Sequence, residues 1–222
     1  MSVNLAMEAS VVDVSTSLPV GSQSSMLTEI YQPKHNIAIW QRTLPTVMTD
    51  AINDMLQTRK SLALVQRVSP DNAAEYIRDK LEGEACAGRL SEDVALIVDM
   101  FCCLFDVEEA GLRLTMLDSA MCPKFHVDQI PCRLVTTYTG IATQWLESKD
   151  IDRSKLGRAS VGIADDLSGL FDNDLAIKQM QAGDVGLLKG SGWKGNEGAG
   201  LVHRSPGLML NERRLLLTLD LV

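Results

Sequence analysis

The sequence has only three histidines, no long apolar run and no repeating cysteine spacing, and each absence excludes a class of protein. Three histidines are too few for a polyhistidine metal cluster, although they suffice for a minimal site that uses two of them. No run approaches the roughly 18 apolar residues of a membrane-spanning helix, so we expect no membrane association. The cysteines are odd in number and unevenly spaced, unlike those of a secreted disulfide framework.

Positive charge is also scarce, because 21 Lys and Arg face 29 Asp and Glu and give a formal net charge of -8. An acidic chain repels polyanions, so we expect no nucleic-acid partner. The first basic residue is Lys34, and the positive segment of a secretory signal is therefore missing from the N-terminus. We expect a cytoplasmic protein. Its substrate, whether a small molecule or a protein, and its oligomeric state do not follow from the sequence.

The length of 222 residues suits one domain with a sizeable core. Residues 1–28 are rich in serine and hold no positive charge, which predicts a flexible N-terminal tail. We expect residues 29–222 to form a single α+β domain. Within it, residues 29–110 are predicted to be mainly helical and residues 111–222 to be β-rich, with an insertion at 147–180.

Apolar residues recur at helical spacing in the first half of the domain. Ser69 followed by Pro70 is typical of an N-cap with proline at the first helical position, and Ser91 is predicted to cap the next helix. The predicted elements are a strand at 35–40 and helices at 46–60, at 69–81 and from 91 to about 105.

Alternating and β-branched residues dominate the second half. The predicted strands lie at 112–117, 124–129, 133–138, 184–189, 201–205 and 214–222. The glycine-rich segment 190–200 joins two of them and lacks the residue order of a phosphate-binding loop. We therefore predict a flexible inter-strand loop there, which could close over a neighbouring site.

One short motif carries candidate chemistry. His126 and Asp128 are two positions apart in a predicted strand, where alternate side chains project to the same side. They supply one nitrogen and one oxygen donor on one face. His203 lies in a later predicted strand, and Arg214 opens the last one.

The ordered set His126, Asp128, His203 and Arg214 resembles the pattern of the iron(II)/2-oxoglutarate-dependent oxygenases. The resemblance implies a double-stranded β-helix (jelly-roll) barrel with an N-terminal helical layer packed on one sheet. It also implies iron(II) bound by the two histidines and the aspartate, with 2-oxoglutarate anchored by an arginine. The implied reaction hydroxylates an unknown substrate. The whole chain further resembles an uncharacterised bacterial family with a domain of unknown function, which supplies no activity.

The chemistry of this ligand set has a physical basis. Two imidazoles and one carboxylate on one face of octahedral iron(II) leave three positions open. The far carboxylate of a 2-oxo acid needs a bidentate cation, for which arginine suits better than lysine. Arg213 shares its face with a row of leucines, whereas Arg214 shares its face with Thr218 and Asp220, so we predict Arg214. Tyr138 is a second predicted co-substrate contact, with packing in a half-buried strand as the alternative.

Two alternatives remain open. Cys122 and Cys132 flank the His126 and Asp128 motif, and thiolates favour zinc. The second hypothesis is therefore a non-catalytic zinc-binding protein of a metal-homeostasis type on a jelly-roll scaffold. In the third, the histidines are hydrogen-bonded core residues and the domain holds no metal.

Overall fold

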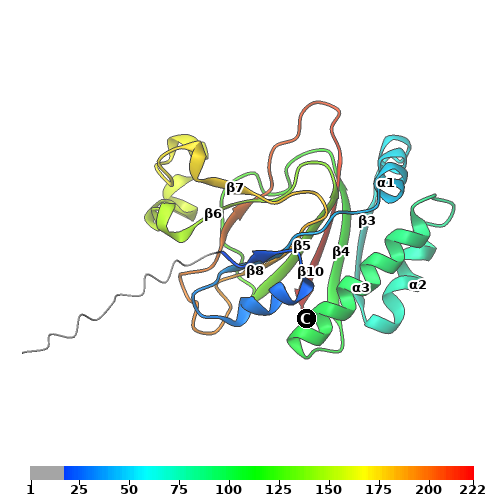
Figure 1. The fold of residues 1–222 in the computed structure, drawn as a ribbon. Helices are drawn as coiled ribbons and strands as arrows, with labels where there is room; N and C mark the ends of the chain where they lie inside the picture. The colour runs from blue at the N-terminus through cyan, green and yellow to red at the C-terminus, as the bar shows by residue number, and fades with distance from the viewer. Residues whose placement is uncertain (1–17) are drawn as a thin grey trace, which may run out of the picture.

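The computed structural model describes residues 18–222, which form a mixed α+β structure with two β-sheets. The larger sheet has strand order β1-β2-β8-β5-β10-β4-β3, and the smaller has order β7-β6-β9. Figure 1 shows the three α-helices on one side of the larger sheet and strands β6 and β7 on the other side. Among residues 18–222, no helix combines the length and apolar character needed to cross a bilayer.

Neighbouring strands in both sheets are antiparallel except for the pair β1 and β2. The larger sheet consists of β1 Val20–Gly21, β2 Ile37–Trp40, β3 Ala63–Val68, β4 Ala110–Leu117, β5 Cys132–Thr139, β8 Val185–Lys189 and β10 Arg214–Leu221. The smaller sheet consists of β6 Gln144–Leu146, β7 Ile177–Gln179 and β9 Val202–Arg204.

Three α-helices lie between the N-terminal segment and β4: α1 Thr46–Thr58, α2 Pro70–Lys80 and α3 Ala87–Phe105. The remaining helices are short 3-10 segments: η1 Ser24–Tyr31, η2 Ser148–Asp150, η3 Arg153–Lys155, η4 Gly157–Ser160, η5 Asp165–Leu167 and η6 Asp174–Ala176. The predicted N-cap of α2 is confirmed, because Ser69 forms a capping box with Asn72.

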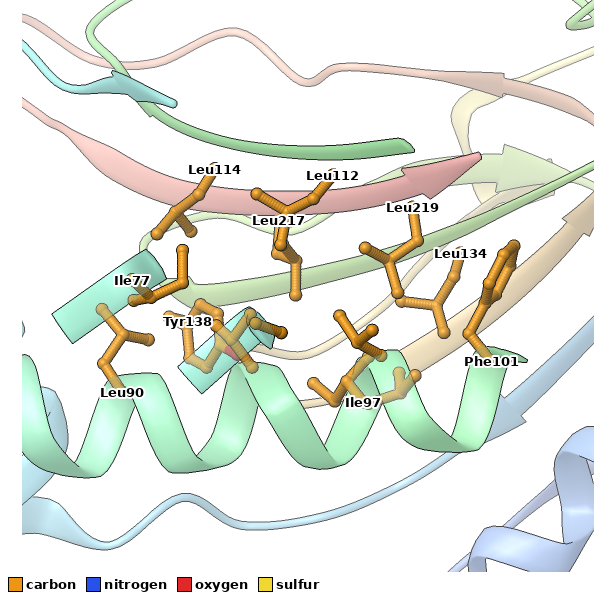
Figure 2. Close-up of a cluster of buried hydrophobic side chains, with 14 of the residues drawn as sticks. Ile77, Leu90, Ile97, Phe101, Leu112, Leu114, Leu134, Tyr138, Leu217 and Leu219 are labelled. Carbon is orange, nitrogen blue, oxygen red and sulfur yellow. The ribbon is translucent and has the colours of Figure 1, made fainter. Parts of the chain in front are cut away.

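The main core lies between the helices and the larger sheet. Figure 2 shows Ile97 and Phe101 of α3 packed toward Leu134 of β5 and toward Leu217 and Leu219 of β10, all fully or almost fully buried. Burying such a side chain contributes about 1.5–3 kcal/mol. The odd-numbered leucines of β10 therefore face the helices. Since strand residues alternate between faces, the even-numbered residues of β10 point away from the helices.

A second core forms on the opposite face of the larger sheet. It joins Ile39 of β2, Val135 of β5 and Leu188 of β8 to Trp145 of the smaller sheet. The two sheets therefore pack against each other through apolar side chains, and the candidate site lies beside this second core.

Several elements differ from the sequence prediction. Residues 1–17 of the predicted tail lie outside the described residues, but residues 18–28 form β1 and most of η1, where Leu27 is buried. The third helix begins at Ala87, so Ser91 lies inside it. Edge strand β3 was missed by the sequence prediction. Val68 is the only buried residue of this strand, so it shows almost no alternating pattern.

Candidate metal centre

His126, Asp128 and His203 come together at one point of the structure. One ligand atom from each lies within 4.8 Å of the other two. The Asp128 carboxylate lies between the rings, with Oδ1 3.5 Å from His126 Nε2 and Oδ2 3.5 Å from His203 Nε2. Ligands about 2.1 Å from a shared metal lie roughly 3 Å apart in adjacent positions, so a small side-chain movement suffices for all three to bind one ion.

The backbone brings the two histidines side by side. His203 lies in β9, while His126 belongs to no regular strand and forms an isolated bridge with it. Each histidine donates its backbone N–H to the carbonyl oxygen of the other at 3.0 Å, and the ring centroids are 4.6 Å apart. The strand predicted at 124–129 is therefore wrong as a regular element. The backbone pairing with β9 ends after His126, because the Asp128 carbonyl oxygen accepts a hydrogen bond from Ser191 and not from β9.

The glycine-rich segment holds Asp128 in place. Ser191 donates its N–H to the Asp128 carbonyl at 2.8 Å, and Gly190 donates to the Pro131 carbonyl at 2.9 Å. A Cβ at Gly190 would lie 2.6 Å from the Asp128 carbonyl oxygen and closer still to that of Ile130. The start of this predicted flexible loop is therefore packed backbone against backbone, and glycine is required by the close approach.

Both imidazole rings are oriented by their own chain. His126 Nδ1 is 2.9 Å from the Lys124 carbonyl oxygen, and His203 Nδ1 is 3.3 Å from that of Leu201. A carbonyl oxygen only accepts, so Nδ1 of each ring carries a proton, and Nε2 is the nitrogen that faces Asp128. This tautomer is the one that a metal between the rings requires.

Burial and charge set the protonation of the three side chains. Burial lowers the pKa of His203 to about 4, so its ring is neutral at pH 7. The hydrogen bond to Asp128 raises the pKa of His126 against the opposing effect of burial. Burial would raise the pKa of Asp128, but the hydrogen bond from His126 and the positive charge of Arg133 lower it overall. The group therefore offers a neutral imidazole beside an ionised carboxylate.

Arg133 and Asp220 belong to this site and were missed by the sequence prediction. Arg133 Nη1 donates to Asp128 Oδ2 at 2.9 Å, while Nε and Nη2 donate to the two oxygens of Asp220 at 2.7 and 2.8 Å. Arg133 and Asp220 are cross-strand partners in β5 and β10. The only sequence signal was that Asp220 shares the face of Arg214.

Arg214 lies in the same pocket as the histidines. The pocket is lined by Met121, Cys122, His126, Arg133, Val135, Thr143, His203, Arg204, Ser205, Arg214, Leu216 and Thr218. Arg214 is 1% exposed, and Gly140, whose Cβ would meet Arg214 Cβ at 2.6 Å, gives it room. Its Nη1 donates to the Ile141 carbonyl at 3.2 Å and its Nη2 contacts Ser205 Oγ.

The charge of Arg214 is not balanced within the described residues. Over residues 18–222 it forms no salt bridge, and its buried Nε has no hydrogen-bond partner. Burial lowers its pKa to about 10, so the side chain stays charged at pH 7. A buried, pre-positioned and uncompensated guanidinium has the charge and the hydrogen-bond donors that a small anion would need.

Arg213 and the predicted co-substrate contact Tyr138 both lie on the helical side of the larger sheet, away from the pocket. Arg213 turns to the helical side, where its Nη1 donates to the carbonyl oxygens of Leu56 and Arg59 at the end of α1. Tyr138 is fully buried in the core beneath the helices (Figure 2). Its hydroxyl donates to Asp93 Oδ2 at 2.8 Å. The predicted role of Tyr138 is therefore wrong, because this residue faces away from the pocket.

The two cysteines of the zinc hypothesis do not join the ligand cluster. Cys132 is fully buried in the helix-facing core, where burial raises its pKa to about 12. Cys122 is exposed and lines the pocket, but its sulfur is not among the atoms that gather within 4.8 Å. The mixed cysteine site therefore lacks the geometry that zinc needs.

Comparison with known proteins places the chain in a family. The profile of the family described as "Protein of unknown function (DUF1826)" matches residues 21–220. The chain belongs to this DUF1826 family. A search of curated proteins found no match.

The DUF1826 chain is similar in structure to several 2-oxoglutarate and iron(II) oxygenases. The rice structure titled dioxygenase for auxin oxidation has a TM-score of 0.51 at 10% identity, over 93% of this chain and 83% of that one. The Arabidopsis thaliana counterpart, titled a 2-oxoglutarate complex, has a TM-score of 0.45 at 9% identity, over 93% and 92%. A Pseudomonas putida prolyl-4-hydroxylase has a TM-score of 0.42 at 12% identity, over 88% and 96%. Of these three structures, the rice one alone has a TM-score above 0.5, so the similarity of fold rests on it.

Proposed function

We propose that this protein is an iron(II)/2-oxoglutarate-dependent oxygenase that hydroxylates a substrate not yet identified. The two packed sheets then correspond to the double-stranded β-helix of that superfamily, with α1 to α3 as its supporting layer. The observation that carries the proposal is the cluster of His126, Asp128 and His203, whose two histidines line the same pocket as the unbalanced Arg214.

The residues present fit both cofactors. Two imidazole nitrogens and one carboxylate suit iron(II) and leave open coordination positions. The buried Arg214 Nε without a protein partner fits a ligand carboxylate, because burying an unpaired polar group is costly unless a ligand supplies the hydrogen bond. When bound, iron(II) would supply a site for activating dioxygen, the oxidant, of which one oxygen atom would go to succinate as 2-oxoglutarate loses carbon dioxide and the other to the hydroxylated substrate.

The chain's own groups would bind and orient the metal ion and the co-substrate. Lys124 and Leu201 fix the two imidazoles through their carbonyl oxygens, so that both Nε2 atoms face the ion. Arg214 holds the distal carboxylate of the co-substrate by charge-assisted hydrogen bonds. His126 has a side chain that is 33% exposed, whereas His203 is buried, so the substrate is expected to approach from the side of His126.

The test is anaerobic addition of iron(II) and 2-oxoglutarate to purified protein. We expect the weak visible charge-transfer band typical of such sites, and its loss in His203→Ala. His35→Ala is the matched control, because it removes the remaining histidine, which does not join the cluster. Absence of the band together with absence of 2-oxoglutarate binding would refute the oxygenase proposal.

The same titration separates a non-catalytic metal protein from an oxygenase. Tight zinc binding without any 2-oxoglutarate binding would favour the metal-homeostasis alternative. Succinate formation from 2-oxoglutarate under air, dependent on iron(II), would support the oxygenase. The cytoplasmic location stays a prediction to be tested separately.

A further inference from the structure

A chain of three charged side chains runs from the candidate metal ligand into the larger sheet. Asp220 on β10 accepts two hydrogen bonds from Arg133 on β5, and the remaining amino group of Arg133 reaches Asp128. The guanidinium thus uses all three of its nitrogens. Its side chain is 22% exposed, and those of Asp128 and Asp220 are 15% and 25% exposed.

The geometry makes Arg133 more than an ion-pair partner. Because Asp220 binds Nε and Nη2 together, the planar guanidinium cannot rotate, and Nη1 has one direction left. That direction leads to Asp128 Oδ2 at 2.9 Å. The carboxylate of Asp128 is therefore held at one oxygen by Arg133, while Oδ1 faces His126.

Asp128 needs this support because its own backbone does not provide it. The segment that carries it is not a regular strand, and its backbone is held by the glycine-rich segment through the carbonyl group alone. The two histidine rings are oriented by hydrogen bonds that their Nδ1 atoms donate to the carbonyl oxygens of Lys124 and Leu201. Within residues 18–222 and outside the triad, only Arg133 carries a charge opposite to that of Asp128 and bonds to its carboxylate.

We propose that Arg133, locked by Asp220, is the positioning residue that presents Asp128 to the metal through a single oxygen. One-oxygen ligation keeps the other coordination positions open for co-substrate. The proposal rests on the proposed function, since it needs a metal at the triad. It goes further by assigning to two residues outside the ligand set the control of metal affinity and coordination geometry.

The competing explanation is that Arg133 and Asp220 only tie β5 to β10. Arg42 and Asp93 offer a matched comparison, because they form an equally bidentate pair at 2.6 and 2.9 Å on the helical side of the sheet. A purely structural pair predicts that Arg133→Gln and Arg42→Gln lose stability alike and leave metal binding alone.

The experiment titrates the full chain with cobalt(II), a spectroscopic substitute for iron(II), and follows both affinity and the visible absorption bands. We expect Arg133→Gln to weaken cobalt(II) binding about 10- to 100-fold and to change the bands, as loss of a partner behind a metal ligand does. Arg133→Lys keeps the positive charge but lacks the planar guanidinium that binds Asp220 and Asp128 together. We therefore expect its cobalt(II) affinity to lie between those of Arg133→Gln and the wild type. Arg42→Gln is expected to bind cobalt(II) like the wild type.

The outcomes separate the two levels of the hypothesis. Wild-type affinity and bands in Arg133→Gln would overturn the positioning role and leave the proposed function standing. An equal loss in Arg42→Gln would also overturn it. If Arg133→Gln does not fold, Arg133→Lys tests the positioning role instead. Unchanged cobalt(II) affinity and unchanged bands in Arg133→Lys would show that a guanidinium bound to both Asp220 and Asp128 is not needed. A wild-type protein that binds no cobalt(II) would overturn both proposals.

Discussion

Replacing Arg214 by methionine tests the co-substrate site most directly. The side chain is buried and charged, and its Nε has no partner in the described residues. A hydrogen bond to a charged group contributes about 1.5–3 kcal/mol, and a carboxylate held by two such bonds loses both in Arg214→Met. Since 1.4 kcal/mol is tenfold in affinity, we expect the Kd for 2-oxoglutarate to rise at least about 100-fold.

The same substitution should not destabilise the cofactor-free protein much. The fall of the Arg214 pKa from 12.5 to about 10 through burial corresponds to about 3 kcal/mol of lost preference for the charged form. Methionine removes that penalty but leaves the Ile141 carbonyl and Ser205 without their donor, which costs about 1–3 kcal/mol. We expect a change in unfolding free energy between zero and a gain of about 2 kcal/mol.

Calorimetric titration with 2-oxoglutarate and urea unfolding measure the two effects. Arg213→Met is the matched control, because the adjacent arginine binds the carbonyl oxygens of Leu56 and Arg59 on the other face. It should lower stability and leave the Kd unchanged. Unchanged affinity in Arg214→Met, or a stability loss above about 3 kcal/mol, would refute the reasoning, because the latter is the mark of a balanced buried charge.

Two further predictions concern the glycine-rich segment and the helix-facing core. Gly190→Ala places a methyl group against the carbonyl oxygens of Asp128 and Ile130, so we expect a stability loss of about 1–3 kcal/mol and weaker metal binding, measured by thermal unfolding and cobalt(II) titration. Tyr138→Phe loses its bond to Asp93 but should leave 2-oxoglutarate affinity unchanged. Burial raises the pKa of Tyr138 well above 10, so the unfolded state loses this proton first and stability falls as pH rises above 10. Tyr138→Phe should remove that part of the alkaline loss in urea unfolding.

Gly190→Ala has a control in the same loop, and each of the two predictions has a contrary result. Gly195→Ala alters the same loop at a position with no atom within 4 Å of the added methyl, although its positive φ adds a small strain. Equal metal affinity in Gly190→Ala and wild type would show that the loop does not hold Asp128. A drop in 2-oxoglutarate affinity in Tyr138→Phe, with the fold intact, would return that residue to the co-substrate site.

The sequence predicted the elements that have strong patterns. The helices α1 and α2 and the strands β4, β5, β8, β9 and β10 lie close to where periodicity placed them. Edge strand β3 and the three-residue strand β6 were missed, because one is almost wholly exposed and the other is too short to show alternation. The ladder at 124–129 failed for a tertiary reason, since the glycine-rich segment takes the hydrogen bond of Asp128.

Which face of a strand meets the helices was predictable only where one of its two faces is uniformly apolar. The leucines of β10 show which side meets the helices, and Arg214 is therefore on the other. In β5 both faces carry β-branched or apolar residues, such as Val135 and Leu134, so alternation alone could not place Tyr138. Only the packing under α3 decided it.

The sequence by itself determined the donor types, their order, and the face of the arginine, because these depend on residue identity and local alternation. Tertiary structure decided that His126, Asp128 and His203 meet, that Arg133 reaches Asp128 from the neighbouring strand, and that the cysteines stand apart. The contacts of His203 with Asp128 and of Arg133 with Asp220 join residues far apart in the chain, and their distances depend on how two sheets and a glycine-rich segment pack together.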